Sequence, residues 1–570
     1  MHILLKPTFT AALAGLLLSF ATTATAQSDQ PIPWHHMANE VEGVPGIALR
    51  QARVMLSEEI PEQRVKVAVL DCGVDATHPA LAGAIHTNLN EIEGNGIDDD
   101  GNGYIDDVAG WNFMVDSTGR SLNFARYEAH YFTHLYDSLQ ASGLPLPAWL
   151  KNLDMDLTRE MAEEAQGYAD DAWFYAEVYF DLAMPFHDTF EEYPDNLEQI
   201  WFHRKAIGLK RDERKFLKFL MSEELTLWDF EYYVQEAWNY DKFWTNPDYN
   251  PRDPNEPDTG YGNNDASGGY EDHGTHVAGT ICGGPTAEGG PIGIANGLVD
   301  IIPVRMVPDG DEIDKDVANA IRYAVDQGAS IINMSFGKYV SSDPERVREA
   351  LRYAAANDVL IVHAAGNDAR DLDAIPFYPN PGRYRDVDSV FINVGASTAS
   401  YDELLIAEFS NVGKRRVDLF APGEDIFSLG ADHDYIDHSG TSMASPVVAG
   451  VAALLRAYFP EFTAAEIKDI LLDSVHEPEF HVLPPGTPPI EVTFTKSMSK
   501  FCSSGTRNAL IHQSASQVVG TGIQTVRHPL FAHFYPGSLD VLNVAIEYQT
   551  RYGMHQNCFA VAGALARVSL

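Results

Sequence analysis

The stretch Val65-Lys66-Val67-Ala68-Val69-Leu70-Asp71-Cys72-Gly73 is a short apolar run that ends in a carboxylate and a glycine. Continuous runs of this kind, rich in β-branched residues, are typical of strands buried on both faces of a parallel sheet. Similar runs follow at residues 300–307, 330–335, 360–364 and 390–394. The pattern predicts a mainly parallel sheet.

Helical patterns separate these apolar runs. The stripe formed by Ile313, Val317, Ile321 and Ala324 has helical spacing, and a second helix is predicted to begin after Ser341-Ser342-Asp343. Alternating strands and helices predict right-handed crossovers and an α/β sheet covered by helices. Ligand chemistry in such sheets gathers at the carboxyl ends of the strands.

Three polar side chains stand at the ends or starts of such elements. Asp71 ends the first run, His273 lies in the small-residue stretch 272–280, and Ser442 lies in the stretch 439–446, which opens another helical pattern. A serine hydroxyl is a weak nucleophile until a neutral imidazole takes its proton, and the imidazole needs a buried carboxylate to orient it. These three residues supply all three parts.

A fourth polar residue fits the same chemistry. Asn367 follows the run at 360–364 and offers a side-chain amide donor. Attack on a peptide carbonyl creates an oxyanion, which needs hydrogen-bond donors that are already in place. The amide of Asn367 and the backbone N–H of Ser442, at a helix start, are the natural pair.

At these motifs the sequence resembles the subtilases, the subtilisin-like serine peptidases. The resemblance covers about residues 60–115 and 265–475 and keeps the family's catalytic order of Asp, His and Ser. The motifs that carry it are Asp71-Cys72-Gly73, His273-Gly274-Thr275-His276-Val277-Ala278-Gly279, Ala365-Gly366-Asn367 and Gly440-Thr441-Ser442-Met443-Ala444-Ser445-Pro446.

The resemblance implies a fold and a set of roles. The fold is a subtilisin-like three-layer α/β/α arrangement with a mainly parallel sheet. Asp71 is the orienting carboxylate, His273 the general base, Ser442 the nucleophile and Asn367 the oxyanion donor. The implied enzyme is a secreted serine endopeptidase that hydrolyses peptide bonds.

The resemblance also implies protein or peptide substrates bound in an extended conformation. Two segments, Ser335-Phe336-Gly337 and Ala364-Ala365-Gly366, are expected to flank the substrate by β-type pairing. Two other functions stay open: a transpeptidase or cyclase on the same triad, and a non-catalytic binding protein on the same scaffold. An intact triad disfavours the binding protein. Asp368 is a weak candidate for selecting cationic side chains.

The catalytic motifs are split by a long acidic and aromatic stretch. Residues 65–115 and 263–475 are predicted to form the peptidase core, and residues 116–262, with six of the eight tryptophans, a helical insertion. Asp71 and His273 are 202 positions apart, so both ends of the insertion lead to catalytic residues. A lid or exosite at the cleft and a remote stabilising subdomain are both open interpretations.

The ends of the chain differ from the core. Residues 1–26 combine Lys6, an apolar run and a small-residue cleavage site, which predicts a secretory signal peptide, a secreted or periplasmic protein, and no membrane association after cleavage. Residues 27–64 form a short N-terminal segment, and residues 476–570 a tail of unclear nature. The net charge of −43 argues against nucleic acid as a partner.

The four cysteines are too few to staple a chain of 570 residues. Cys502 and Cys558 could pair within the tail, whereas Cys72 and Cys282 are predicted to be buried thiols. Cys72 stands where the subtilases usually have Ser or Thr, which predicts sensitivity of the activity to mercurials.

An acidic loop predicts structural calcium. The stretch 98–107 resembles the front half of a calcium loop, with the predicted ligands Asp98, Asp100, Asn102, Tyr104 (through its carbonyl) and Asp106. Position 12 of the loop is Ala109 instead of Glu, so another ligand is needed, and Asp99, Asp107 and Glu91 are candidates. An unmetallated turn is the alternative. Zinc signatures, a P-loop and a dinucleotide fingerprint are all missing from the sequence, so no organic cofactor is expected.

Overall fold

The computed structural model describes residues 32–485, apart from 191–192, 195, 223–233, 253–256, 268–270, 287–288, 477, 479, 481 and 484, together with 558–559. The predicted signal peptide and Cys502 lie outside the described residues. Within the described part, no helix is both long enough and apolar enough to cross a membrane.

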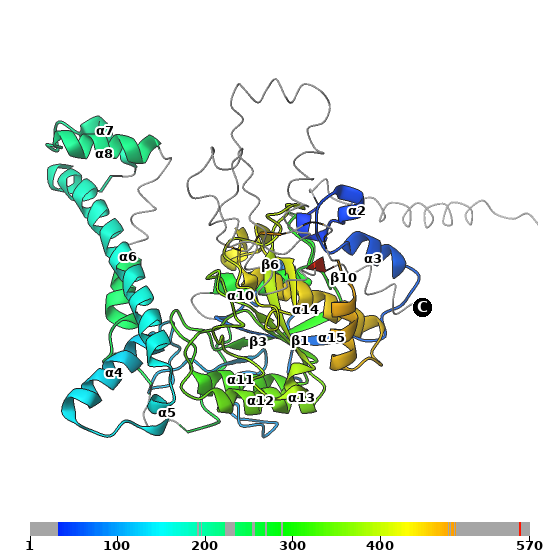
Figure 1. Ribbon diagram of the computed structural model, residues 1–570. Helices are drawn as coiled ribbons and strands as arrows, with labels where there is room; N and C mark the ends of the chain where they lie inside the picture. Colours follow the sequence, from blue (N-terminus) through cyan, green and yellow to red (C-terminus); the bar gives the residue numbers. More distant parts are fainter. Residues whose placement is uncertain are drawn as a thin grey trace, which may run out of the picture.

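A nine-stranded sheet forms the centre of the core (Figure 1). Its strand order is β10-β11-β7-β6-β5-β4-β1-β3-β2, and the pairs from β7 to β2 are all parallel. The strands are β1 (Val65–Asp71), β2 (Trp111–Asn112), β3 (Val299–Arg305), β4 (Ile331–Met334), β5 (Leu360–Ala364), β6 (Phe391–Ser397), β7 (Leu419–Pro422), β10 (Val475–His476) and β11 (Cys558–Phe559). All five predicted runs are strands, so the predicted sheet is confirmed.

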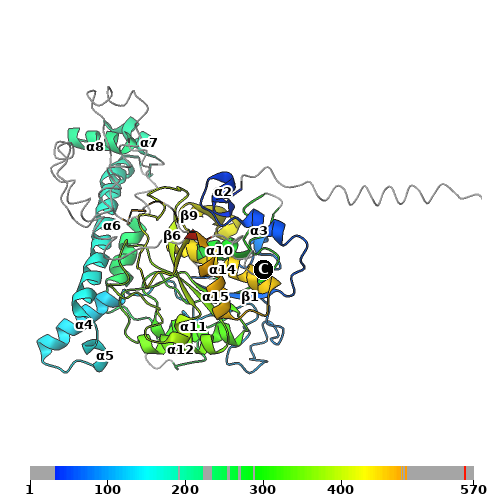
Figure 2. The ribbon, with the colours of Figure 1, turned by 45° about the vertical axis from the view of Figure 1, so that its right-hand side comes forward.

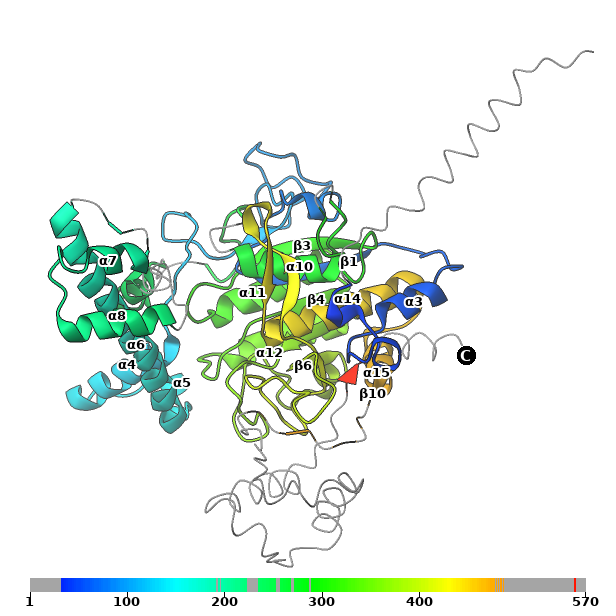
Figure 3. The same cartoon turned by 90° about the horizontal axis from the view of Figure 1, so that it is seen from above.

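Helices cover both faces of this sheet (Figures 1 and 3). One face carries α10 (Glu271–Cys282), α14 (Thr441–Tyr458) and α15 (Ala464–Asp473), and the other carries α11 (Asp314–Asp326), α12 (Pro344–Ala356) and α13 (Arg385–Asp388). Burial on both faces explains why the strands are continuously apolar. The three-layer α/β/α fold is therefore confirmed, and a small hairpin of β8 (Ile426–Leu429) and β9 (Tyr435–His438) is added to it.

Both predicted helices are present, and Ile313, the first residue of the predicted stripe, is the N-cap of α11. Val317, Ile321 and Ala324 are buried on the inner side of α11. The side chain of Asp343 accepts a hydrogen bond from the backbone N–H of Arg346 and caps α12, as the residues before this helix predict.

The insertion stands beside the core as a helical arm (Figures 1 and 2). Its first helices lie next to the core, and the 36-residue helix α6 carries α7 and α8 at its far end. The helices are α4 (Glu128–Ser142), α5 (Ala148–Lys151), α6 (Met155–Phe190), α7 (Leu197–His203) and α8 (Arg211–Ser222), followed by the π-helix η3 (Tyr240–Trp244). Phe132 and Leu150 pack in one cluster with Val340 of the core, which fixes the near end of the arm.

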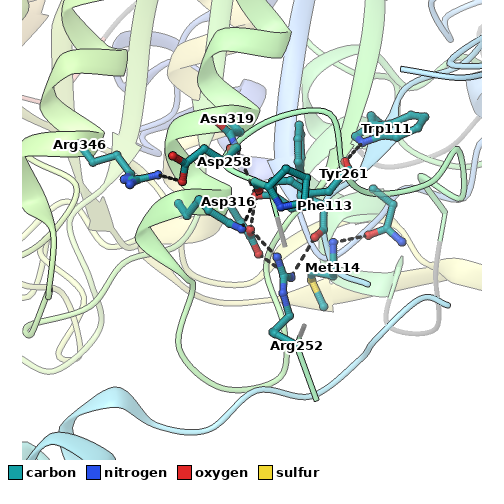
Figure 4. Close-up of polar contacts among 12 residues, drawn as sticks. Trp111, Phe113, Met114, Arg252, Asp258, Tyr261, Asp316, Asn319 and Arg346 are labelled. Atoms are coloured by element: carbon teal, nitrogen blue, oxygen red, sulfur yellow. Dashed lines mark hydrogen bonds and ion pairs between the residues drawn. The ribbon is translucent and has the colours of Figure 1, made fainter. Parts of the chain in front are cut away.

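The segment that leaves the insertion is anchored on α11 (Figure 4). Both terminal nitrogens of Arg252 bond the carboxylate of Asp316 at 2.9 Å, and Arg252 also donates to the carbonyl of Phe113. The hydroxyl of Tyr261 donates to the same Asp316 carboxylate. A bidentate, buried pair of this kind holds the chain in one geometry just before α10 begins.

The N-terminal segment packs on the core instead of forming a core of its own. It contains the short helices η1 (Trp34–His36), α2 (Asn39–Glu42) and α3 (Leu49–Met55). Leu49 and Ala52 belong to the main hydrophobic cluster, and the indole N–H of Trp34 donates to the carbonyl of Glu424. The two histidines of η1 are buried.

Candidate active site

The four residues predicted to act in catalysis line one cavity of about 880 Å³. Asp71 is the last residue of β1, His273 lies in the first turn of α10, Ser442 is the second residue of α14, and Asn367 follows β5. Parallel strands present their carboxyl ends at one edge of the sheet, where the helix starts also lie. The fold therefore brings together side chains that are far apart in the sequence.

Asp71 and His273 form a short hydrogen bond. His273 Nδ1 lies 2.7 Å from Asp71 Oδ1, which also accepts the backbone N–H of Cys72 at 2.9 Å. The carboxylate is 2% exposed, whereas the imidazole is 38% exposed and faces the cavity. Burial acts to lower the pKa of His273, but the charge and the hydrogen bond of Asp71 outweigh it, so the pKa lies above its usual value.

The hydroxyl of Ser442 is turned toward the core. It donates to the carbonyl oxygen of Ser335 at 3.0 Å, and no hydrogen bond between Ser442 and His273 forms in the described part of the chain. Catalytic hydrogen bonds are often completed only when substrate is bound. The hydroxyl and the imidazole therefore line one cavity, and a side-chain rotation of Ser442 would be needed to bring them into contact.

The amide of Asn367 is oriented by Thr441, a residue that the sequence analysis missed. Asn367 Oδ1 accepts the backbone N–H of Thr441 at 2.8 Å and its hydroxyl at 2.9 Å. A backbone N–H can only donate, so the atom that it meets must be the amide oxygen. This leaves the amide nitrogen free of hydrogen-bond partners among the described residues, as a donor for an oxyanion requires.

A buried polar chain holds the start of α14 over β4. Ser445 donates to the side-chain oxygen of Asn333 at 2.8 Å, and the amide nitrogen of Asn333 donates to Ser335 Oγ at 2.9 Å. Ser335 Oγ in turn donates to the carbonyl of Ser442 at 2.8 Å. Every member of this chain is satisfied, so it fixes the backbone of Ser442.

The two segments predicted to flank the substrate reach the same cavity, with one exception. The lining residues from these segments are Ser335, Phe336, Gly337, Ala364 and Gly366. Ala365 is fully buried, its N–H donates to Val394, and its carbonyl accepts from Asn411. Ala365 thus supports the cleft without lining it. Asn411, which also went unpredicted, comes from a distant loop with no local sequence signal.

The thiol and the additional histidines near the triad are not in a catalytic form. Burial and the charge of Asp71 raise the pKa of Cys72 well above its usual value, so its thiol stays protonated at neutral pH. Burial lowers the pKa of His276 to about 3, and its Nε2 lies 2.7 Å from the carbonyl of Ile426. His438 packs against His276 with ring centroids 5.0 Å apart. Sensitivity to mercurials remains a prediction.

Side chains of the insertion line the same cavity as the triad. They come from the start of α4 and from the first half of α6, and they are Tyr127, Ala129, Met161, Glu164, Ala165 and Tyr168. This placement favours a role at the cleft over a remote stabilising subdomain. The length of the insertion hinted at such a role, but no residue within it marked the contact.

The acidic loop gathers a different set of carboxylates from the predicted one. The Asp98 carboxylate accepts the N–H groups of Gly101, Asn102 and Gly103, and Asp106 accepts those of Asn95 and Gly96. The carboxylates whose oxygens lie within 4.8 Å of one another are Glu91, Asp100 and Asp107. Hard oxygen donors of this kind suit calcium. Two of the three, Glu91 and Asp107, were considered only as supplementary ligands.

Known proteins resemble this chain through the same core. Residues 62–483 match the family model described as the Subtilase family. The major intracellular serine protease of Bacillus subtilis (strain 168) is 38% identical over 201 residues, which cover 35% of this chain and 60% of that protein. Subtilisin DY of Bacillus licheniformis is 33% identical over 202 residues, which cover 35% of this chain and 68% of that protein.

A solved structure gives a similar match. The crystal structure of a cold adapted subtilisin-like serine proteinase is 35% identical, covers 36% of this chain and 68% of that one, and has a TM-score of 0.30. The chain spans 60% and 54% of the length of two intracellular serine proteases, from Bacillus subtilis and Paenibacillus polymyxa. Since the family model covers most of its length, the chain belongs to the subtilase family.

Proposed function

We propose that this protein is a serine endopeptidase that hydrolyses peptide bonds through Asp71, His273 and Ser442, with Asn367 in the oxyanion hole. The observation that carries the proposal is the 2.7 Å contact of Asp71 with His273 at the cavity that Ser442 and Asn367 also line. A carboxylate, an imidazole, a hydroxyl and an oriented amide at one cavity are the parts that acyl transfer needs.

Acylation begins with proton transfer. Ser442 Oγ attacks the carbonyl carbon of the scissile bond while His273 takes its proton, and Asp71 stabilises the imidazolium that forms. Negative charge develops on the carbonyl oxygen. The amide nitrogen of Asn367 and the backbone N–H of Ser442 donate hydrogen bonds to it, in positions fixed before the reaction.

The tetrahedral intermediate then collapses. His273 gives its proton to the leaving amine, the C–N bond breaks, and an ester joins Ser442 to the acyl part of the substrate. A water molecule gives a proton to His273 as it attacks this ester. The second collapse releases the carboxylic acid, and the proton returns to Ser442.

The substrate is a protein or peptide segment in an extended conformation. Ser335 to Gly337 lie on one side of the cavity's strand ends, and Ala364 and Gly366 belong to the neighbouring strand end. Backbone groups at such ends can pair with an added strand, while side chains enter alternate pockets.

A fluorophosphonate probe tests the proposed nucleophile. We expect the full-length protein to be labelled at one serine, and peptide mapping to place the label on Ser442. Ser442→Ala should lose both labelling and hydrolysis, whereas Ser439→Ala should keep both. Labelling of another serine would contradict the proposal. Products formed in the presence of an added amine distinguish hydrolysis from a transpeptidase reaction.

We also propose export through residues 1–26. The support is the sequence pattern of a short positive start, an apolar run and the Ala24-Thr25-Ala26 end. The mature protein should begin at Gln27 and be found outside the cytoplasm. N-terminal sequencing of the fractionated protein tests this, and a cytoplasmic protein that retains Met1 would contradict it.

A structural calcium ion at Glu91, Asp100 and Asp107 is a further proposal. Its support is the convergence of the three carboxylates in one loop, where Glu91 also accepts the backbone N–H groups of Asp99 and Asp100. The ion would stabilise the folded loop and take no part in the reaction. We expect millimolar calcium to raise the melting temperature relative to EDTA, and Asp100→Asn to remove this effect while Glu93→Gln, an exposed carboxylate of the same loop, keeps it.

A further inference from the structure

The insertion and one loop of the core enclose part of the cavity together. The loop between β3 and α11 contributes Asp309, Asp311 and Glu312, and the insertion contributes Tyr127 and the residues of α6 named above. The backbone N–H of Glu128, the first residue of α4, donates to the Asp311 carboxylate at 2.7 Å. The two walls are therefore fixed relative to each other.

This part of the cavity has carboxylates but no available cation. Among the described residues that line the cavity, Lys338 is the only Lys or Arg. Its side chain is 6% exposed, and its ammonium group is paired with Glu128 and lies 3.3 Å from Asp314. Its positive charge is therefore already balanced by carboxylates of the protein itself.

Two of the carboxylates, Asp309 and Glu312, form no ion pair among the described residues, and the nearest ammonium group, that of Lys338, is paired with Glu128 and Asp314. Glu312 is 6% exposed, and no hydrogen bond from another residue reaches its carboxylate in the described part of the chain. Burial outweighs the opposing charge of Lys338 and raises the pKa of Glu312 to about 8. Burial and the charge of Glu236 raise the pKa of Asp309 to about 7. Solvated acids on the surface of a highly acidic protein show no such shift, because water stabilises their charge. An incoming cation would stabilise these groups.

The insertion also contributes an aromatic side chain, Tyr127, to the cavity. Tyr127 lines the cavity together with Asp309 and Asp311, and its ring packs edge-on against Trp244, whose indole N–H donates to the carbonyl of Asp309. Burial and the charges of Asp311 and Asp309 raise the pKa of Tyr127. Aromatic faces and carboxylates together bind ammonium and guanidinium groups, through cation–π contacts and charge-assisted hydrogen bonds.

We propose that the insertion and the β3–α11 loop form a subsite for a Lys or Arg side chain of the peptide substrate, with Asp309 and Glu312 as acceptors and Tyr127 as the aromatic wall. This inference rests on the proposed peptidase function. It differs from the expectation for Asp368, whose carboxylate already accepts the hydroxyl of Tyr339 at 2.6 Å.

Matched peptides test the subsite with the full-length enzyme. Fluorogenic peptides carry either arginine or citrulline, its neutral isostere, at one position at a time around the cleaved bond. We expect kcat/KM to favour arginine by about tenfold or more at one position, since a desolvated charge pair contributes energy of this order. The double variant Asp309→Asn with Glu312→Gln should bring the ratio near one. Glu349→Gln, an exposed carboxylate of α12 away from the cavity, should leave the ratio unchanged.

Two outcomes would overturn the inference. Equal kcat/KM for arginine and citrulline at every position would do so in the native enzyme, without any variant. An arginine preference that survives the double variant would place the subsite elsewhere. Failure of the peptidase proposal is distinguishable, because neither peptide would then be cut and the fluorophosphonate probe would not label Ser442.

Discussion

The amide of Asn367, the proposed oxyanion donor, shows how a single site residue depends on its neighbours. Its oxygen is held by the backbone and the hydroxyl of Thr441, next to the nucleophile, and the same hydroxyl accepts the N–H of Gly366. The proposed nucleophile and the proposed oxyanion donor are thus connected by one residue. Preorganised donors of this kind contribute to the rate because they need no reorientation during the reaction.

Removal of this amide should slow the chemical step. We expect Asn367→Ala to lower kcat by about 10²–10³, the size of the loss measured for the matching donor of subtilisin, with little change in KM. The reason is that the donor meets charge only in the transition state. Steady-state kinetics on one peptide measures this, with Asn357→Ala, at the end of α12, as the control. A loss confined to KM would contradict the assigned role.

The acid limb of the activity reports on His273. The imidazole acts as a base only when neutral, and its pKa in the folded protein lies above 6.5, since the effect of Asp71 exceeds that of burial. We therefore expect kcat/KM on an uncharged peptide to fall as the pH drops, with an apparent pKa above 6.5. An acid limb centred below 6.5 in the native enzyme would show that Asp71 does not act on His273 in this way.

The sequence predicts the triad because each member sits in a local motif. Asp71, His273 and Ser442 lie at the end or near the start of an element, and the topology of the sheet brings these ends together. Asn411 and Lys338 could not be predicted in this way. Their partners lie 46 and 210 positions away, so their roles exist only after folding.

At the scale of elements, the insertion is joined to the core by buried charges. Lys338 follows the substrate segment Ser335–Gly337, and its ammonium group contacts Glu128 of α4 and Asp314 of α11. Arg370, three residues after Asn367, pairs with Glu160 and Glu164 of α6. Each of these two charge clusters connects the insertion to a core segment that carries residues lining the cavity.

Loss of the buried ion pairs of Lys338 should destabilise the protein. Lys338→Met leaves Glu128 and Asp314 buried without their cation, and removal of one partner from such a pair costs about 3–5 kcal/mol in the free energy of unfolding. The double variant with Glu128→Gln should recover part of this loss. Denaturant unfolding measures both variants.

A surface ion pair supplies the control for this experiment. Arg346 and Asp343 have side chains that are 35% and 51% exposed, so Arg346→Met should cost less than about 1 kcal/mol. If Lys338→Met cost as little free energy of unfolding as Arg346→Met, the ion pairs of Lys338 would not stabilise the attachment of the insertion to the core.

Strands and helices of the core were more predictable than the insertion. Apolar runs and caps such as Asp343 determine the core elements locally. The long helix α6 contains Pro185 and has an alanine-rich buried side, so its sequence indicates a helix but neither its length nor its partners. Its position depends on contacts with Val340 and Arg370 of the core.

At the scale of the whole molecule, the N-terminal segment buries two of its own histidines against the core. His35 and His36 are buried with ring centroids 4.3 Å apart, and each has a ring nitrogen without a hydrogen-bond partner among the described residues. Burial lowers the pKa of His35 to about 4 and that of His36 well below 6.5. Packing of the segment against the core therefore favours the uncharged form of both imidazoles.

This burial predicts acid lability of the fold. In the unfolded chain a histidine takes up a proton below about pH 6.5, whereas His35 in the folded protein does so only near pH 4. The unfolded state therefore binds more protons in this window. The stability contributed by neutral His35 is complete above pH 6.5 and is lost as the pH falls, by up to ~1.4 kcal/mol per pH unit.

Other groups act in the opposite direction, so the test compares variants. The raised pKa of Glu312 makes the folded state bind the extra proton, which favours folding as the pH falls from about 8. The same Glu312 contribution is present in native protein and in His35→Gln, and it cancels in their difference.

We expect the melting temperature of His35→Gln to fall less steeply between pH 6.5 and 4.5 than that of the native protein. His433→Gln, which changes an exposed histidine, should keep the native slope. Equal slopes for all three proteins would show that His35 takes up its proton without unfavourable burial, and that the N-terminal segment does not depend on a neutral imidazole.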